Sequence, residues 1–201
     1  MNIAHFFTIL RIFIIPLFPL FYLKYQWLGI PAIYLPYILL IILILCELTD
    51  IIDGFLARRK NQVTDLGKVL DPMADSITRI LVFFTYTQGW IAAPLLLVFI
   101  FLYREFIITT LRTVCAFEGF ALGARKSGKT KAIIQAAVNI FIVILMIPFT
   151  LGYLSLEMLR FISISAIAFA AIFSALTAVE YIYVHRNYLK KILSGGENGK
   201  S

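Results

Sequence analysis

Long apolar stretches separated by short polar turns dominate this sequence. Residues 27–46 contain no charged residue, and residues 132–156 and 161–179 are also uncharged and of similar length. A helix of about 20 apolar residues is long enough to span a hydrocarbon core of roughly 30 Å. The pattern therefore predicts an all-α, polytopic membrane protein.

Dividing the apolar stretches at their polar and glycine-containing turns predicts six transmembrane helices and an N-terminal amphipathic start. We expect Pro16 and Pro19 to be tolerated within the first helix, because membrane helices can compensate for freed backbone groups. Residues 1–190 are expected to form one transmembrane domain, and the polar, glycine-rich residues 191–201 a disordered tail. The approximate helix ranges are 8–22, 29–58, 66–86, 91–117, 132–150 and 158–183.

The composition and charge of the chain agree with this class. Of the 201 residues, 61% are hydrophobic and 14% are charged, whereas soluble domains are about half apolar and a quarter charged. The net charge of +7 comes largely from basic residues in short segments between helices, which is typical of a membrane topology signal rather than of nucleic-acid binding. With six spans, the positive-inside rule places both termini at the cytoplasmic face of the inner membrane.

Acidic residues gather in one segment, residues 50–75, which holds five of the eleven acids. Asp50 and Asp53 are three residues apart at the end of one expected helix. Asp71 and Asp75 are four residues apart near the start of the next, so each pair lies on one helix face. Two antiparallel helices could direct these carboxylates towards one point on the cytoplasmic side. Hard oxygen ligands without His or Cys predict a site for Mg²⁺, Mn²⁺ or Ca²⁺.

Small and basic residues accompany the acids. Gly54, Ala57 and Gly67 would let a backbone or a ligand approach closely. Arg58 lies one turn beyond Gly54 and is suited to bidentate contact with a diphosphate. Two metal ions about 4 Å apart would stabilise both sides of a phosphoryl displacement. The alternative is that each Asp merely caps a helix and each basic residue marks topology; four acids at matched spacing favour the metal site.

The pattern D-x2-D-G-x2-A-R-x8-G-x3-D-x3-D resembles, without a gap, the signature of the CDP-alcohol phosphotransferases. The resemblance implies a six-span fold, and members of this family usually form homodimers. It also implies a reaction in which an alcohol attacks the β-phosphorus of a CDP-linked lipid and releases CMP. It also implies that Asp75 accepts the proton of the attacking hydroxyl. The residues implied to hold two Mg²⁺ or Mn²⁺ ions are Asp50, Asp53, Asp71 and Asp75. Those implied to bind the CDP-lipid are Asp50, Gly54, Ala57, Arg58, Thr64 and Gly67.

Segments outside the signature bear on the acceptor alcohol. Residues 2–16, 103–112 and 128–135 are similar to segments of the bacterial phosphatidylglycerophosphate synthases within that family. Thr8 and Arg11 stand at matching positions, and the similarity implies that they help to bind the acceptor phosphate. This similarity implies CDP-diacylglycerol and glycerol 3-phosphate as substrates. Ser76 stands where this subfamily commonly has Lys, so another acceptor such as inositol phosphate is the alternative.

Charges inside an otherwise apolar expected helix support a phosphorylated acceptor independently. Arg104, Glu105 and Arg112 interrupt this helix, and an intramembrane charge indicates a functional site by default. With Lys129 and Lys131, the two arginines are candidates for binding the acceptor phosphate. The alternative is that Arg104 pairs with Glu105 or a motif Asp as a structural bridge, and that the lysines contact only lipid headgroups.

Two other classes of protein also use membrane-embedded carboxylates. Membrane prenyltransferases direct Asp pairs at Mg²⁺-diphosphate, but they typically need more spans. Their chemistry also does not explain the segment Gly54-x2-Ala57-Arg58 after the acids. A cation transporter would use the carboxylates without any lipid substrate. Release of pyrophosphate would favour the first class, and metal flux without lipid the second.

Overall fold

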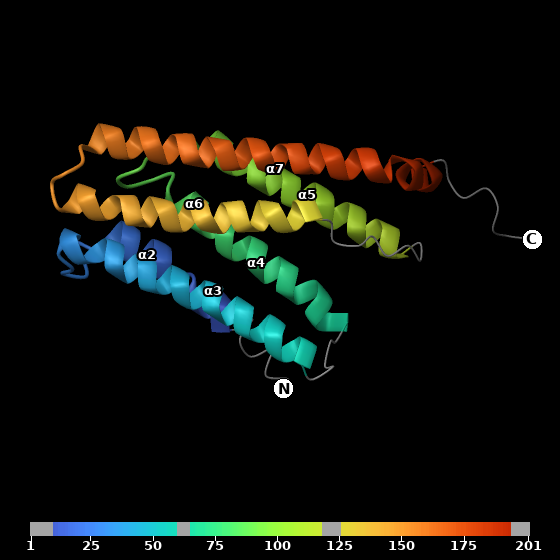
Figure 1. The fold of residues 1–201 in the computed structure, drawn as a ribbon, viewed down its shortest axis with the longest axis horizontal. Coiled ribbons are helices and arrows are strands. Elements are labelled where there is room, and N and C mark those ends of the chain that lie inside the picture. The colour runs from blue at the N-terminus through green and yellow to red at the C-terminus, as the bar shows by residue number, and fades with distance from the viewer. Residues whose placement is uncertain (1–9, 60–64, 118–125, 194–201) are drawn as a thin grey trace, which may run out of the picture.

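The computed structural model describes the backbone of residues 10–59, 65–117 and 126–193, and the side chains of residues 10–49, 75–115 and 127–186. Over these ranges it is all-helical (Figure 1), as predicted. Residues 10–14 form a short helical segment. The elements that follow are α2 (Leu17–Lys24), the 3-10 helix η1 (Ala32–Tyr34), α3 (Leu35–Arg59), α4 (Asp65–Thr85), α5 (Leu95–Phe117), α6 (Lys126–Thr150) and α7 (Leu156–Leu193).

Several described helices are long and apolar enough to cross a membrane, so the chain is a membrane protein. They include the segments Ala32–Thr49, Ser127–Thr150 and Leu156–Arg186, which match the second, fifth and sixth expected spans. The third and fourth expected spans form helices α4 and α5. The first half of α4 is polar and α5 contains charged residues. The length and composition of these two helices alone therefore do not identify them as membrane spans. The count of six spans stays a prediction.

The first expected span is not one continuous helix, so this prediction was wrong. The helical segment 10–14 ends in a turn at Ile15 and Pro16, and α2 begins at Leu17. Proline lacks the N–H that would continue the earlier helix, but it fits the start of the next one. Pro19 lies in the first turn of α2, where backbone N–H groups have no intrahelical partner anyway. Residues 1–9, including Thr8, lie outside the described residues.

Other helix boundaries also differ from the predicted ones. α3 begins later than residue 29, because Gly29 adopts φ of 69° and the 3-10 helix η1 intervenes. α7 continues to Leu193, three residues into the expected tail, since the glycine-rich sequence begins only at Ser194. Residues 194–201 lie outside the described residues.

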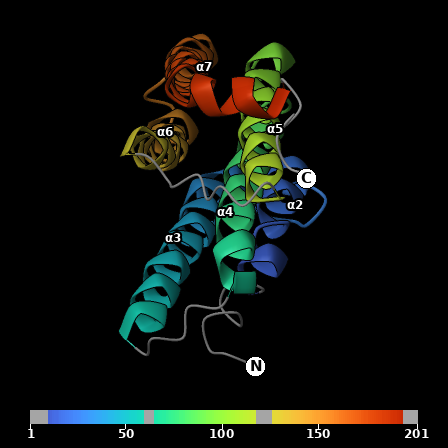
Figure 2. The same cartoon turned by 90° about the vertical axis from the view of Figure 1, so that its right-hand side faces the viewer.

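The helices form a bundle with two distinct ends. α7 packs against α5 and α6, α3 packs against α6 and α2, and α4 lies between α2, α5 and α6 (Figure 2). The end of α3 and the start of α4 lie at one end of the bundle, together with the end of α5 and the start of α6 (Figure 1). We call this the motif end. The opposite end, the turn end, carries the connections 25–34, 86–94 and 151–155.

Gly89 allows the turn between α4 and α5 to pack on Tyr22. Its φ is +68°, and an added Cβ would lie 2.8 Å from Cε1 of the Tyr22 ring. Gly89→Ala should therefore lower the free energy of unfolding by about 1–2 kcal/mol for the left-handed backbone and by roughly 1–3 kcal/mol more for the clash. Thermal unfolding of the detergent-purified protein would measure this loss.

Gly152→Ala is the matched control. Gly152 has φ of +80°, and an added Cβ would meet nothing within 4 Å, so only the backbone cost is expected. Equal losses for the two variants would contradict the packing role of Tyr22.

Candidate functional site

The acidic motif lies on two helices that meet the same end of the bundle. Asp50 and Asp53 lie near the end of α3, and Asp71 and Asp75 lie in the first half of α4. Of these four side chains, the structure describes that of Asp75, so the convergence of all four carboxylates stays a prediction. The other predicted CDP-lipid contacts, Gly54, Ala57, Arg58, Thr64 and Gly67, also lie outside the described side chains.

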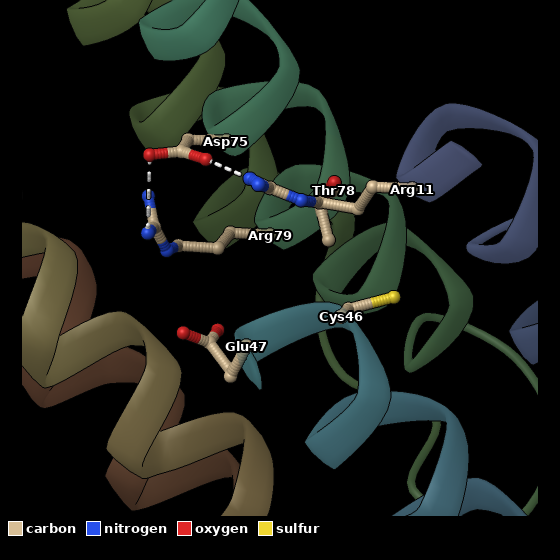
Figure 3. Close-up of a pocket in the computed structure, with 6 residues that line it drawn as sticks. All are labelled: Arg11, Cys46, Glu47, Asp75, Thr78 and Arg79. Atoms are coloured by element: carbon tan, nitrogen blue, oxygen red, sulfur yellow. Dashed lines mark hydrogen bonds and ion pairs between the residues drawn. The ribbon is translucent and has the colours of Figure 1, made fainter. Parts of the chain in front are cut away.

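Asp75 is held between two buried arginines (Figure 3). Its carboxylate accepts a hydrogen bond from Arg11, on the helical segment 10–14. Arg79, one turn further along α4, places Nη2 3.7 Å from the other carboxylate oxygen. The Asp75 side chain is partly exposed, whereas both arginines are buried. Two cations therefore hold and orient the carboxylate that the resemblance implies to be the base.

A small pocket opens beside Asp75. Its volume is about 10 Å³, which is roughly the space that one water needs. Glu47, on α3, faces this space across from Arg79 (Figure 3). The pocket is lined by Arg11, Cys46, Glu47, Asp75, Thr78 and Arg79.

A second charged cluster is in contact with Ser76, the residue that follows Asp75. The carboxylate of Glu105, on α5, accepts hydrogen bonds from Ser76 Oγ at 2.6 Å and from Lys131 Nζ at 2.8 Å. Nη1 of Arg104 donates to the same carboxylate at 3.0 Å. One carboxylate thus joins α4, α5 and α6. We call Ser76, Arg104, Glu105 and Lys131 the Glu105 cluster.

The Glu105 cluster carries more positive than negative charge. Arg104 and Lys131 are only 7% and 4% exposed, and they share one carboxylate. A buried cation is stable only when it is paired or hydrogen-bonded. Among the described side chains, this surplus of positive charge favours an anionic ligand in contact with Arg104 and Lys131.

The predicted acceptor-phosphate residues are distributed over different places. Arg104 does pair with Glu105, as one interpretation held. The view that Lys131 contacts only lipid headgroups is wrong, because α6 begins at Lys126 rather than at residue 132 and the Lys131 side chain is buried within the bundle. Lys129 is exposed.

Arg112 contacts α7 instead of the Glu105 cluster. Its Nε lies 3.4 Å from Tyr181 Oη, and its guanidinium lies 5.6 Å from the centroid of the Tyr181 ring. Arg11 is bound to Asp75. Among the described candidates, the structure brings Arg104 and Lys131 together.

Sequence reasoning gave no site role to Arg79, Glu47, Thr78 or Ser76. Spacing could have found Arg79, since it lies four residues after Asp75, the separation of a helical ion pair. Glu47 likewise continues the motif by one turn towards the membrane. The bond between Ser76 and Glu105 joins residues 29 positions apart, and no local pattern indicates it.

Residues 1–176 match the family described as CDP-alcohol phosphatidyltransferase, and the chain belongs to this family. It is therefore a membrane-embedded transferase of phospholipid biosynthesis. This membership confirms the resemblance and sets aside the prenyltransferase and transporter alternatives.

Curated relatives share one name, CDP-diacylglycerol--glycerol-3-phosphate 3-phosphatidyltransferase. The protein of Sodalis glossinidius (strain morsitans) is 31% identical over 200 residues, which cover 94% of this chain and 97% of the relative. The protein of Bacillus subtilis (strain 168) is 32% identical over 161 residues, or 75% of this chain and 80% of the relative. The protein of Treponema pallidum (strain Nichols) is 33% identical over 140 residues, or 65% of this chain and 63% of the relative.

Proposed function

We propose that this chain transfers the phosphatidyl group of CDP-diacylglycerol to glycerol 3-phosphate and releases CMP. In this reaction the acceptor hydroxyl forms a bond to the β-phosphorus while the bond from that phosphorus to the CMP oxygen breaks. The observation that carries the proposal is the surplus positive charge of Arg104 and Lys131 among the described side chains. Glu105, which both of them contact, is also bound to Ser76, the residue that follows Asp75. The shared name of the relatives, which specifies glycerol 3-phosphate, supports the same acceptor.

Unsatisfied donors add support for a phosphorylated acceptor. The Nε atoms of Arg79 and Arg104 are buried without a hydrogen-bond partner among the described residues. Leaving a buried donor unpaired costs about 1–3 kcal/mol, and phosphate oxygens are strong acceptors for guanidinium groups. Serine offers a single carboxylate and inositol only neutral hydroxyls, so neither supplies the several charged oxygens of a phosphate. Inositol phosphate would satisfy them, so it remains the second acceptor to test.

The donor set of the motif fits hard divalent cations. We assign Asp50, Asp53, Asp71 and Asp75 as the residues that would hold two Mg²⁺ or Mn²⁺ ions. When bound, such ions neutralise a diphosphate and stabilise a leaving CMP. The described side chains alone contain no cluster of three or more metal-binding residues, because they include only one of these four carboxylates.

The remaining roles follow from the signature and from the contacts of Asp75. Asp75 accepts the proton of the attacking hydroxyl on a carboxylate oxygen, while Arg11 and Arg79 hold that carboxylate in place. Gly54 and Arg58 contact the CDP moiety, and Ala57, Thr64 and Gly67 complete its site.

Membrane orientation and assembly are part of the same proposal. We infer that the motif end faces the cytoplasm from the inner membrane, because basic residues accumulate in the segments on that side. The resemblance to the family supports a homodimer.

Purified protein with CDP-diacylglycerol and Mg²⁺ or Mn²⁺ should release CMP when glycerol 3-phosphate is added. Serine and inositol should give no release above the rate without acceptor, and a chelator should stop the reaction. A panel that includes inositol phosphate identifies the acceptor. Turnover with serine or inositol but not with glycerol 3-phosphate would reject the proposed acceptor, and turnover that persists in chelator would reject the metal assignment.

A further inference from the structure

A larger hollow lies at the turn end of the bundle, away from the acidic motif. Its volume is about 370 Å³, within the range of roughly 300–1,000 Å³ that is typical of ligand pockets. It lies between the end of α2 and the turn that joins α4 to α5. We call it the turn-end hollow. Its lining residues are Tyr22, Leu23, Lys24, Tyr25, Gln26, Gln88, Gly89 and Trp90.

Packed aromatic rings hold the walls of this hollow in place. Tyr22 is buried, and its hydroxyl donates to the carbonyl oxygen of Gln88 at 3.3 Å. The Trp90 ring lies edge-on to Tyr22 and Tyr25, with centroid distances of 6.3 and 5.4 Å. Phe149 of α6 packs on Trp90 at 5.1 Å. The walls are therefore fixed by contacts within the protein and do not depend on a ligand.

The hollow lies at the level where the membrane spans end. One apolar span ends at Thr150, directly after Phe149, and the next begins at Leu156. Because Phe149 packs on Trp90, Trp90 lies close to this boundary. Trp and Tyr are enriched at the headgroup level of membranes, where one part of the ring is apolar and the other is hydrated.

Positive charge flanks the hollow. The charged residues of the turn end are Lys24, Glu157 and Arg160, which leaves this end with a net positive charge. Lys24 lines the hollow. Nε of Arg160 donates to the carbonyl oxygen of Trp90 at 2.9 Å, so its guanidinium lies beside the same wall. Neither Arg160 nor Glu157 is among the lining residues, but Arg160 is hydrogen-bonded to Trp90, which is.

We propose that the turn-end hollow binds the phosphate headgroup of an anionic membrane phospholipid. Lys24 and Arg160 contact the phosphate, and the amides of Gln26 and Gln88 hydrogen-bond to the headgroup. The aromatic wall accommodates the glycerol region of the lipid. A lipid suits this place better than a free anion, because the hollow combines aromatic rings at the headgroup level with cations at its edge. The site is separate from the acidic motif at the other end of the bundle.

Tryptophan fluorescence tests this proposal directly. The chain has two tryptophans, and Trp27 is exposed, so Trp27→Phe leaves Trp90 as the single reporter in the wall of the hollow. The variant is placed in nanodiscs of zwitterionic lipid that contain equal mole fractions of brominated phosphatidylglycerol or brominated phosphatidylcholine. We expect stronger quenching of Trp90 by the anionic lipid. Equal quenching by both lipids would overturn the proposal.

Charge variants in the same background identify the contacts. Lys24→Gln and Arg160→Gln should each weaken the apparent affinity for the anionic lipid about tenfold, the loss expected for one charge-assisted contact. Arg186→Gln removes an exposed cation at the other end of α7 and should leave the quenching unchanged. Selectivity that survives in the Lys24→Gln/Arg160→Gln double variant would overturn the assignment.

Inorganic phosphate distinguishes a lipid site from a site for a free anion. Added to the nanodiscs at moderate concentration, it should leave the quenching by brominated phosphatidylglycerol in place. Complete displacement would reject a lipid as the ligand. If a charge variant is less stable, native mass spectrometry of the Trp27→Phe protein provides a second measurement, in which preferential retention of the anionic lipid supports the proposal and equal retention overturns it.

Discussion

Replacing Asp75 with Asn is expected to lower the rate of CMP release by about 10³-fold or more, the upper part of the range for loss of a general base. Asn has nearly the same shape, but it cannot accept the proton of the attacking hydroxyl. It also cannot balance the charges of Arg11 and Arg79, which contact the Asp75 carboxylate. Binding of CDP-diacylglycerol should persist, since the other motif residues are unchanged.

Asp65→Asn provides the matched control for this prediction. Asp65 belongs to the same segment and begins α4, but it lies outside the register of the four motif acids. The Asp65→Asn variant should retain most of the CMP-release activity. Near-normal CMP release by Asp75→Asn would remove Asp75 from the role of base.

Replacing Glu105 with Gln should give a large loss of stability. The change keeps the size of the side chain but leaves Arg104 and Lys131 buried without their shared counter-charge. Breaking a buried ion pair by removing one partner costs about 3–5 kcal/mol, which thermal unfolding in detergent would detect. Glu157→Gln, which alters an exposed acid in the first turn of α7, should leave the unfolding temperature nearly unchanged.

A double variant separates the structural role of this cluster from its role in binding. Glu105→Gln/Lys131→Met removes one charge of each sign and so keeps the net charge of the Glu105 cluster. Much of the stability should return, whereas KM for glycerol 3-phosphate should rise because Lys131 no longer contacts the acceptor phosphate. A double variant with an unchanged KM would exclude Lys131 from the acceptor site.

The sequence predicted the parts of the fold that depend on local pattern. Long uncharged stretches predicted α6 and α7, and the spacing of the acids placed the motif across the end of α3 and the start of α4. The start of α6 was predicted too late, at residue 132 instead of Lys126, because the first residues of this helix are polar. In an apolar helix the charge of Lys131 indicates a boundary, unless a distant partner such as Glu105 compensates for it.

The contacts of the candidate site were less predictable because they join distant parts of the chain. Arg11 and Asp75 are separated by 64 positions, and only the packing of the helical segment 10–14 beside α4 brings them together. Arg79 could be predicted from its helical spacing to Asp75. The resemblance to a family assigned roles to single residues, but it did not indicate which basic residues would be buried together.

Glu105, on α5, contacts both α4 and α6, and this links the proposed acceptor site to the helix that carries Asp75. Ser76 follows Asp75 directly on α4, and its hydroxyl is bound to the same carboxylate as Lys131. An acceptor that draws Lys131 towards its phosphate would therefore change the hydrogen bonds of a carboxylate that also restrains the residue next to Asp75. Communication between the two substrates then requires only the exchange of a few hydrogen bonds, while the helices keep their places.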